Sequence, residues 1–425
     1  MNSPQFINKV TKPFDIELTL PGSKSIALRH LVISALASEP TELVGIPRCD
    51  DIDAMVDSLS RLGVGIESAG RSRLAVDPPG TLAAGEVHID ARLSGVSLRF
   101  LLAVAALRRD LTHIDGGPPL RVRPNRDMIE ALRQLGCDAQ AADDEGHLPI
   151  SVTGPDDWAR EVEVGTRVSS QYLSGLMLIA PRLPHGLTLR PKDEPVSAPY
   201  VEITRTEMER RGVPVRTSGT DTIRIDPAPY RGGTVSIEGD ASAATYFAAA
   251  ATLHASSVRF ANLGASTTQG DFAFFDICRR LGADVEARDN TVSIQGPATL
   301  QPIGQVDMED MSDAAPTLMA MAPFLPGATQ ITGLSTLRHK ECDRIACPAR
   351  ELRKAGVAVE EGADWVRIHP VSAPRPAQFE TYDDHRMAMS LAVFASQVGG
   401  CAILDPGCVA KTYTDFWEDL AEVYA

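Results

Sequence analysis

Gly239-Asp240-Ala241-Ser242 leads into a run from Ala243 to Leu253 that is rich in alanine and almost wholly apolar. Asp is a preferred residue at the N-cap of a helix, and alanine is the strongest helix former. The stretch therefore predicts a helix that begins directly after Asp240.

The same kind of junction occurs six times at nearly constant spacing. Its marker residues lie 71, 75, 71, 72 and 72 residues apart and are Ser23, Ser94, Ser169, Asp240, Ser312 and Asp384. A stretch rich in Ala, Leu and Met follows each of them, at Ile26 to Leu36, Leu98 to Leu107, Tyr172 to Ile179, Ala243 to Leu253, Ala315 to Phe324 and Met387 to Phe394. We predict that each junction opens a helix.

A second mark repeats in step with the first. An amphipathic helix ends before a glycine, and an apolar strand then starts, at Gly63, Gly136, Gly212, Gly282 and Gly356. Such glycines fit the C′ position, where the backbone is left-handed. A period of this length, with two helices and several short strands, predicts six copies of one α/β unit and not a thin solenoid repeat.

Six units divide into two groups of three, which predicts two domains. Turn-rich segments near residues 18–22 and 229–233 mark the boundaries. We expect a first domain of residues 20–235 and a second of residues 1–19 plus 236–425. The opening strand, Phe14 to Leu20, is expected to belong with the C-terminal half.

Composition limits the possible partners. The chain has 425 residues, a formal net charge of -15, and seven cysteines without a C-x-x-C pair. An acidic chain argues against nucleic acid as a partner. The N-terminus has no secretory pattern, and no apolar run reaches the roughly 18 residues of a membrane span. We expect a soluble, cytoplasmic monomer with reduced thiols, no membrane partner and no cofactor.

Positive charge gathers at the junctions. A helix N-terminus carries about half a positive charge and attracts anions. Cationic or titrating side chains directly follow three of the junctions: Lys24, Arg29, Arg99, His385 and Arg386. Lys340 and Arg344 lie about one helix after the fifth junction. If the six helix starts converge on one cleft, that cleft favours phosphate or carboxylate.

The segment from Arg338 to Arg344 is the densest group of charges, with three cations and two carboxylates. On a helix, Lys340 and Arg344 face the same way, and Glu341 is free to donate or accept a proton. The alternative is a salt-bridged exposed helix. Each of the other motifs also has a structural alternative: Lys24 as a solvated lysine, and Asp313, Ser169 and Ser170 as helix caps.

The histidines show no metal-ligand spacing. His30, His88, His113, His147 and His254 are separated along the chain, so we expect surface or core histidines and no metal site.

Taken in order, the motifs resemble those of the 5-enolpyruvylshikimate-3-phosphate synthase family across nearly the whole chain. They are Pro21-Gly22-Ser23-Lys24-Ser25, Val168-Ser169-Ser170-Gln171, Gly239-Asp240-Ala241-Ser242, Met311-Ser312-Asp313-Ala314-Ala315, Lys340-Glu341-Cys342-Asp343-Arg344, Asp384-His385-Arg386-Met387-Ala388-Met389 and Ala410-Lys411-Thr412. The resemblance implies a two-domain inside-out α/β barrel. Each domain would hold three βαβαββ units around buried parallel helices, with the active site between the domains.

The resemblance also implies a reaction, the transfer of the enolpyruvyl group of phosphoenolpyruvate to the 5-hydroxyl of shikimate 3-phosphate, without a metal. Asp313, Glu341 and Lys24 would be catalytic. Shikimate 3-phosphate would be held by Lys24, Ser25, Arg29, Ser169, Ser170, Gln171, Ser197, Tyr200, Asp313 and Lys340. Phosphoenolpyruvate would be held by Lys24, Gly95, Arg123, Gln171, Arg344, Arg386 and Lys411.

These residue types suit two anionic substrates, which repel each other unless fixed cations bring them together. Because the cations are divided between the two halves of the chain, we expect substrate binding to draw the domains together.

Several positions depart from the family pattern. Ala27, Leu28, Leu93 and Val96 stand where the family has hydrogen-bonding or small residues, and Thr336-Leu337 stands where some members have an Asn-Trp pair. We expect altered affinity for phosphoenolpyruvate and unusually weak binding of glyphosate, an inhibitor that uses this pocket in the family.

Other functions remain open. The related enzyme that acts on UDP-N-acetylglucosamine uses a cysteine in the loop before its Arg-Pro pair, and residues 116–124 contain none. A paralogue with a different acceptor, an RNA-end-processing protein and a non-catalytic anion-binding module are further alternatives. Low aromatic content, 5%, disfavours RNA, and the presence of Asp313 and Glu341 disfavours a dead module.

Overall fold

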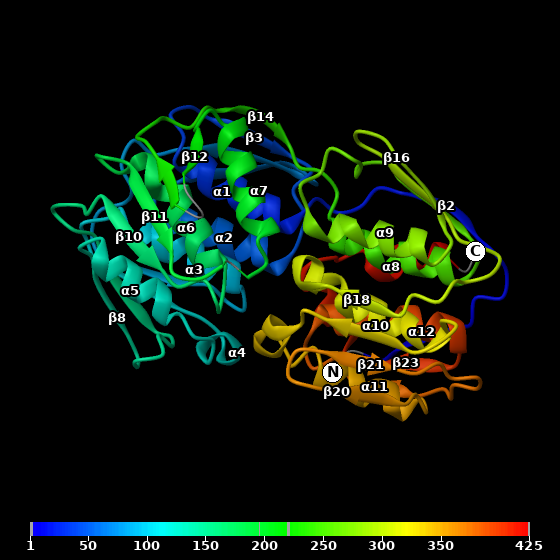
Figure 1. Cartoon of the computed structure of the whole chain (residues 1–425). Helices are drawn as coiled ribbons and strands as arrows, with labels where there is room; N and C mark the ends of the chain where they lie inside the picture. Colours follow the sequence, from blue (N-terminus) through cyan, green and yellow to red (C-terminus); the bar gives the residue numbers. More distant parts are fainter. Residues whose placement is uncertain (1–2, 195, 219–221, 424–425) are drawn as a thin grey trace. The chain divides into compact units, whose positions relative to one another are not determined.

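The computed structural model describes residues 3–194, 196–218 and 222–423. It separates into two compact units, Gly22–Ile237 and Met1–Pro21 with Glu238–Ala425. We call them the central unit and the terminal unit (Figure 1). Each unit is described by itself.

Three helices form the interior of the central unit. Because these helices lack a polar face, they are buried on almost every side. They are α1 (Lys24–Ala35), α3 (Gly95–Ala106) and α6 (Gln171–Ile179), followed by the short 3-10 helix η1 (Ala180–Arg182).

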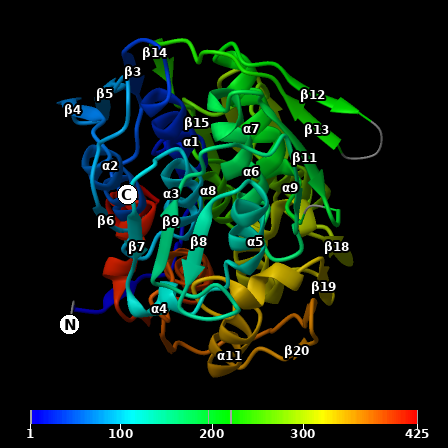
Figure 2. The same cartoon turned by 90° about the vertical axis from the view of Figure 1, so that its left-hand side faces the viewer.

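Three four-stranded sheets surround these helices. Each sheet has one parallel pair and a hairpin added antiparallel to it. In spatial order the first sheet is β14 (Gly233–Ser236), β3 (Thr41–Val44), β5 (Arg73–Asp77) and β4 (Gly65–Gly70). The second is β6 (Val87–Asp90), β7 (Thr112–Asp115), β9 (Ile150–Thr153) and β8 (Asp138–Ala141), visible side by side in Figure 2. The third is β10 (Glu161–Val164), β11 (Leu187–Pro191), β13 (Thr222–Ile225) and β12 (Val215–Ser218).

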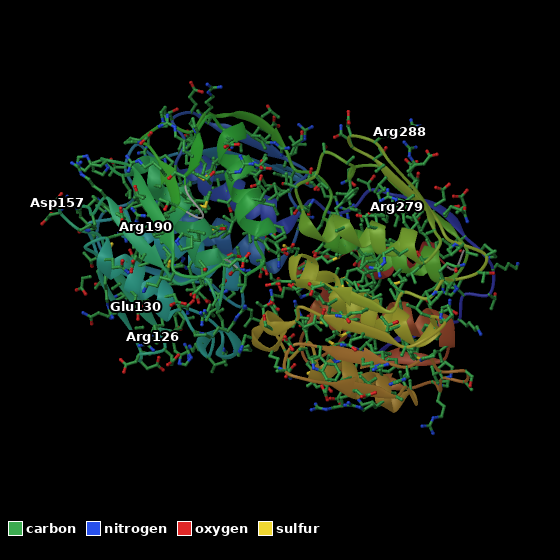
Figure 3. The ribbon with its side chains drawn as sticks, viewed as in Figure 1. Arg126, Glu130, Asp157, Arg190, Arg279 and Arg288 are labelled. Atoms are coloured by element: carbon green, nitrogen blue, oxygen red, sulfur yellow. The ribbon has the colours of Figure 1, made fainter. Side chains whose placement is uncertain are left out.

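Amphipathic helices connect the strands of the central unit. They are α2 (Asp50–Arg61), α5 (Arg126–Gln134) and α7 (Pro199–Arg210), and a short helix α4 (Pro118–Arg121) precedes α5. Their charged faces point to solvent, and Figure 3 labels one example, Arg126 and Glu130 on α5, whose Nε and Oε1 atoms are 3.1 Å apart.

The terminal unit repeats this plan. Its buried helices are α8 (Ala241–Leu253), α10 (Ala315–Met321) and α12 (His385–Val398). Its outer helices are α9 (Phe274–Arg280), α11 (Ala346–Lys354) and α13 (Phe416–Glu422). Short 3-10 helices lie between them: η2 (Gly270–Ala273), η3 (Glu309–Ala314), η4 (Ala322–Phe324), η5 (Ser335–His339) and η6 (Pro406–Lys411).

The sheets of the terminal unit have four, four and three strands. The first is β16 (Asp284–Ala287), β17 (Val292–Gln295), β15 (Ser257–Phe260) and β2 (Asp15–Leu18). The second is β18 (Gln305–Asp307), β19 (Thr329–Thr332), β21 (Val366–Ile368) and β20 (Val359–Glu361). The third is β1 (Gln5–Ile7), β23 (Cys401–Ile403) and β22 (Gln378–Phe379).

Two strands are exchanged relative to a simple repeat. β2 precedes α1 along the chain but pairs with β15 of the terminal unit, and β14 precedes α8 but pairs with β3 of the central unit. The sixth sheet is also incomplete within the described residues, since β1 supplies its only antiparallel partner. The pairing of β2 with the C-terminal half is as predicted, and among the six repeated units, as the structure describes them, only the sixth departs from the full set of strands.

The predicted helix ends are confirmed. The five glycines at the C′ positions of the outer helices all have positive φ angles, between 85° and 103°. Among the six junctions, Ser94, Asp240 and Asp384 cap their helices through the side chain.

At the other three junctions a helix also begins at or near the marker residue, as predicted, but that residue does not cap it through its side chain. Ser23 is the N-cap residue of α1, but its side chain makes no capping hydrogen bond. Ser170, not Ser169, is the N-cap residue of α6. Ser312 lies inside η3, because Pro316 can only occupy the first turn of α10 and so delays the start of that helix.

Within the described part of the chain, no helix combines the length and apolar character that crossing a membrane requires.

Candidate active site

Asp313 is the centre of a charged cluster in the terminal unit. Its Oδ1 atom lies 3.1 Å from Arg344 Nη1 and 3.5 Å from Lys340 Nζ. Its Oδ2 atom lies 2.8 Å from Arg386 Nη2. Three cations from two separate segments thus converge on one carboxylate that is mostly buried.

These cations determine the protonation state of Asp313. Burial alone would raise the pKa of its carboxyl group, but the charges of Arg386, Lys340 and Arg344 outweigh burial and hold the pKa well below its ordinary value. Asp313 is therefore ionised at neutral pH and accepts hydrogen bonds only.

Arg344 connects Asp313 to two further carboxylates. Its Nε and Nη2 atoms bind Asp384 at 2.7 and 3.1 Å, and Nη2 also binds Glu341 Oε2 at 2.7 Å. Lys411 Nζ lies 3.0 Å from the other oxygen of Glu341. Burial would lower the pKa of Arg344, but the three carboxylates raise it instead. The cluster thus pairs its cations with protein carboxylates.

The segment that carries Lys340 and Arg344 is not the predicted helix. η5 ends at His339 and α11 begins at Ala346, with irregular backbone between them. Asp343 explains the late start of α11, because its Oδ1 atom accepts hydrogen bonds from the N–H groups of Ile345 and Ala346, each at 3.0 Å. Lys340 and Arg344 nevertheless reach the same oxygen of Asp313.

A second buried carboxylate lies behind Asp313. Asp271, in η2, accepts a hydrogen bond from Ser242 Oγ, which lies 3.4 Å from Arg386 Nη2. Burial, reinforced by the charge of Asp313, raises the pKa of Asp271 to about 6. Arg386 Nη1 also lies 3.4 Å from Tyr246 Oη, and burial raises the pKa of Tyr246 to about 12.

In the central unit, Lys24 lies in the first turn of α1. Its Nζ atom is 2.9 Å from Asp51 Oδ2, and both side chains are largely buried. The alternative of a solvated lysine is therefore wrong. Ser23 precedes it, and the buried Ser23 Oγ has no hydrogen-bond partner among the described residues.

Arg29 contacts two other residues of the predicted site, Ser25 and Tyr200, and also Thr204. It is 1% exposed, and its guanidinium donates to Thr204 Oγ1 at 2.8 Å, to Ser25 O at 2.7 Å and to Tyr200 O at 2.8 Å. Burial lowers the pKa of Arg29 to about 10, so that it remains charged at neutral pH. Ser197, just before α7, adopts a positive φ of 54°.

Gly95 and Arg123 are in close contact. A Cβ atom on Gly95 would lie 2.7 Å from Arg123 Nη1 and 3.0 Å from its Cζ. Arg123 Nε is buried and makes no hydrogen bond to any residue that the structure describes. The absence of a side chain at Gly95 thus leaves room for the guanidinium at the start of α3.

Arg99 connects this contact to α6. Its Nη1 donates to Gln171 Oε1 at 2.6 Å, and its Nε lies 3.4 Å from Asn125 Oδ1. Asn125 in turn donates to Arg123 O at 3.0 Å. Ser169 and Ser170 precede Gln171, and Ser169 Oγ accepts from the Gln171 N–H at 3.2 Å.

The structure therefore groups the predicted residues into clusters within each unit. It also adds members that the predicted site did not include: Arg99, Asn125, Asp271, Ser242, Tyr246 and Asp384. Arg99, Ser242 and Asp384 stand in or beside the junction motifs that the sequence already marked. Asn125, Asp271 and Tyr246 carry no signal in the sequence, because only the fold brings them to these clusters.

Two of the histidines that are separated along the chain are neighbours in the structure. His88 and His113 occupy paired positions on β6 and β7, and their rings stack with centroids 4.7 Å apart.

Comparisons with known proteins agree with this arrangement. The family model of EPSP synthase, 3-phosphoshikimate 1-carboxyvinyltransferase, matches residues 9–420. The 3-phosphoshikimate 1-carboxyvinyltransferase of Shewanella sediminis is 35% identical over 428 residues, which cover 98% of this chain and 97% of that protein. The protein of the same name from Photobacterium profundum is 35% identical over 412 residues, covering 96% of each chain.

Solved structures show the same fold. EPSP synthase from Acinetobacter baumannii has a TM-score of 0.83 at 23% identity and covers 99% of this chain and 98% of its own. The enolpyruvyl transferase NikO from Streptomyces tendae has a TM-score of 0.78 at 18% identity and covers 99% and 97%. The predicted two-domain α/β fold is thereby confirmed.

Proposed function

The chain belongs to the EPSP synthase family, and from this premise we propose how its own residues bind and join the two substrates. The reaction is the enolpyruvyl transfer of the shikimate pathway, with phosphoenolpyruvate as donor and shikimate 3-phosphate as acceptor. Phosphate is released. The observation that carries the proposal is the convergence of Lys340, Arg344 and Arg386 on Asp313.

Residues of both units would hold shikimate 3-phosphate. In the central unit the hydroxyl groups at the start of α6 lie where helix N–H groups favour an anion. Arg29 fixes Ser25 and the backbone of Tyr200, which supports a shared role for these residues. The full set is Lys24, Ser25, Arg29, Ser169, Ser170, Gln171, Ser197, Tyr200, Asp313 and Lys340.

Phosphoenolpyruvate would be held mainly by guanidinium and ammonium groups. Arg123 supports this role, because its buried Nε has no partner among the described residues and its guanidinium lies beside the N-terminus of α3. Arginine binds carboxylate and phosphate through two parallel hydrogen bonds. The full set is Lys24, Gly95, Arg123, Gln171, Arg344, Arg386 and Lys411.

Asp313 would take the proton of the attacking 5-hydroxyl group. The hydroxyl oxygen bonds to C2 of phosphoenolpyruvate while C3 gains a proton, which gives a tetrahedral intermediate. Loss of a proton from C3 then expels phosphate and restores the double bond. Glu341 and Lys24 are the groups proposed for the two proton transfers at C3.

Substrate binding would also make Asp313 a stronger base. In the structure its pKa is held low by Arg386, Lys340 and Arg344. Anionic substrates that take hydrogen bonds from these cations weaken their effect on Asp313, so that its pKa rises when the site is filled.

Because the cations are divided between the units, neither unit alone neutralises both substrates. We propose that binding brings the two clusters together and excludes water. The free thiols of the seven cysteines support a reducing, cytoplasmic location. A monomer is proposed, since each unit has a complete core of its own.

Weak glyphosate binding is a further proposal. Ala27 and Leu28 are fully buried in α1 and cannot donate hydrogen bonds through their side chains, and Leu93 and Val96 are aliphatic beside Gly95. A glyphosate titration in the presence of shikimate 3-phosphate tests this, and inhibition as strong as in a sensitive family member would contradict it.

The test of the function is phosphate release from phosphoenolpyruvate with shikimate 3-phosphate, compared with shikimate and with UDP-N-acetylglucosamine. We expect release with shikimate 3-phosphate alone, and its loss in Asp313→Ala. Release with another acceptor would identify a paralogue. No release with any acceptor would favour a non-catalytic anion-binding protein.

A further inference from the structure

The outward face of the β6–β7 pair carries an unusual group of side chains. The parallel register places His88 opposite His113 and Ile89 opposite Ile114. Side chains alternate between the two faces of a strand, so the isoleucines point into the core while both histidines point outward. Glu86 directly precedes β6 with the same alternation as His88.

One oxygen of Glu86 lies between the two imidazoles. Glu86 Oε1 is 3.1 Å from His88 Nε2 and 3.1 Å from His113 Nε2, and all three atoms lie within 4.8 Å of one another. A tetrahedral site with metal–ligand bonds of 2.0–2.1 Å has ligand atoms about 3.3 Å apart. The carboxylate oxygen therefore already lies at nearly the required separation from each imidazole nitrogen.

At least one imidazole must rotate for both to point at one ion. Their planes are 18° apart, whereas a shared ion must lie in both planes. His88 is exposed, so that its ring can turn about χ2 without displacing the core. His113 is the more fixed ligand, because its Nδ1 atom lies 3.3 Å from Ser151 Oγ on β9.

The contact between His113 and Ser151 resembles the hydrogen bond that a metal-bound histidine makes through its other ring nitrogen. A histidine that binds a metal through Nε2 carries its proton on Nδ1 and donates it to a neighbouring oxygen. Ser151 Oγ is such an oxygen, since a hydroxyl group can accept as well as donate, and it can therefore support the tautomer whose Nε2 binds a cation once metal displaces the proton that Nε2 shares with Glu86.

The backbone that carries Glu86 is also fixed. Gly85 donates its N–H to Asp110 Oδ2 at 2.8 Å, and its carbonyl accepts from the buried side chain of Arg108. Val87 N–H then donates to Leu111 O at 3.1 Å, where β6 begins. The carboxylate thus starts from an ordered position beside the two histidines.

A cavity adjoins the group. It has a volume of about 340 Å³ and is lined by His88, His113, Asp90, Asp115, Arg61 and Pro149 among others. Water from this space can reach a fourth coordination position.

We propose that Glu86, His88 and His113 bind one Zn²⁺ ion per chain, with water as the fourth ligand. Two imidazole nitrogens and one carboxylate oxygen form a donor set that zinc accepts. The site lies outside the residues proposed for enolpyruvyl transfer. Bound zinc would join β6 to β7 and stabilise the native state of the central unit.

The experiment uses the tag-free full chain, freed of metal by chelation and then titrated with Zn²⁺ in equilibrium dialysis. We expect one zinc per chain. His88→Ala and His113→Ala should each abolish this binding, and Ser151→Ala should weaken it about tenfold. The matched control is His369→Ala, because His369 forms an exposed pair with Glu360 at 2.8 Å but has no second histidine.

A second measurement separates this site from the thiols. Co²⁺ bound by nitrogen and oxygen gives visible absorption without the charge-transfer band of a cobalt thiolate. One zinc per chain that persists in the His88→Ala/His113→Ala double variant, a thiolate band in the cobalt spectrum, or no binding step near one zinc per chain would each overturn the proposal.

Discussion

Arg344 donates two hydrogen bonds to Asp384, from Nε to Oδ2 at 2.7 Å and from Nη2 to Oδ1 at 3.1 Å. The two side chains are 2% and 0% exposed, respectively. Asp384 also accepts the Arg386 N–H at 2.9 Å at the start of α12. One buried carboxylate thus orients Arg344 and fixes the backbone from which Arg386 reaches Asp313.

We expect Asp384→Ala to destabilise the protein strongly. Removing one partner of a buried ion pair costs about 3–5 kcal/mol, and Arg344 would lose two hydrogen bonds and keep only its contacts with Asp313 and Glu341. The measurement is the free energy of unfolding in urea. Glu42→Ala is the control, since Glu42 pairs at 3.0 Å with Arg73 where both side chains are exposed, and such pairs contribute about 1 kcal/mol or less. Equal losses in the two variants would contradict this reading of the cluster.

Asp313→Asn should abolish most of the activity and leave the fold intact. The amide keeps the shape of the side chain but cannot take a proton, and loss of a general base lowers kcat by about 10²–10⁴-fold. Asp310→Asn is the matched control, an exposed carboxylate in the same 3-10 helix. Steady-state kinetics and the thermal midpoint are measured for both variants. A kcat within a few-fold of the wild type would remove Asp313 from the proposed mechanism.

Asp271 predicts a pH dependence of stability. Burial raises its pKa from 3.8 to about 6, so that the folded protein holds the proton more tightly than the unfolded chain. Its contribution to the free energy of unfolding is therefore favourable at low pH and declines as the pH rises from about 4 to 6. Asp271→Asn removes this decline. The variant should match the wild type near pH 4 and be more stable above pH 6, by about 3 kcal/mol at most.

Urea unfolding across this pH range provides the test, with Asp276→Asn as control because Asp276 lies in α9 with a 69% exposed side chain. If Asp271→Asn and the wild type differ by the same amount at pH 4 and pH 7, ionisation of Asp271 makes no such contribution.

The period of the sequence predicted the buried helices well for a physical reason. A helix that is apolar on all sides can only be buried, and a glycine with a left-handed backbone can only end the helix before it. Both signals are local, so Asp240 with its alanine run and Gly63 at the end of α2 were readable without the fold.

Pairing between distant segments was not readable in the same way. No local feature of the β14 sequence indicates that this strand pairs with β3, about 190 residues earlier. His88 and His113 became neighbours only through strand register. The prediction that Lys340 and Arg344 lie on a helix was wrong. The spacing of their charges suggested a helix, but α11 begins only after Asp343, whose carboxylate accepts hydrogen bonds from the N–H groups of Ile345 and Ala346.

Gly95→Ala should weaken phosphoenolpyruvate binding without harming the fold. The new Cβ would lie 2.7 Å from Arg123 Nη1, so that the guanidinium must move from the start of α3. A lost hydrogen bond between charged groups is worth about 1.5–3 kcal/mol, which corresponds to roughly a 10- to 150-fold rise in KM for phosphoenolpyruvate. Stability should stay equal or rise, because alanine is the better helix former.

Gly80→Ala is the control for this change, since no atom lies within 4 Å of a Cβ at Gly80. The two variants separate a local effect on Arg123 from a general effect of added methyl groups. A KM for phosphoenolpyruvate that is unchanged in Gly95→Ala would mean that Arg123 moves without loss of binding, and its proposed contact with this substrate would then be wrong. A rise in KM together with a lower thermal midpoint would instead place the effect in the packing of α3.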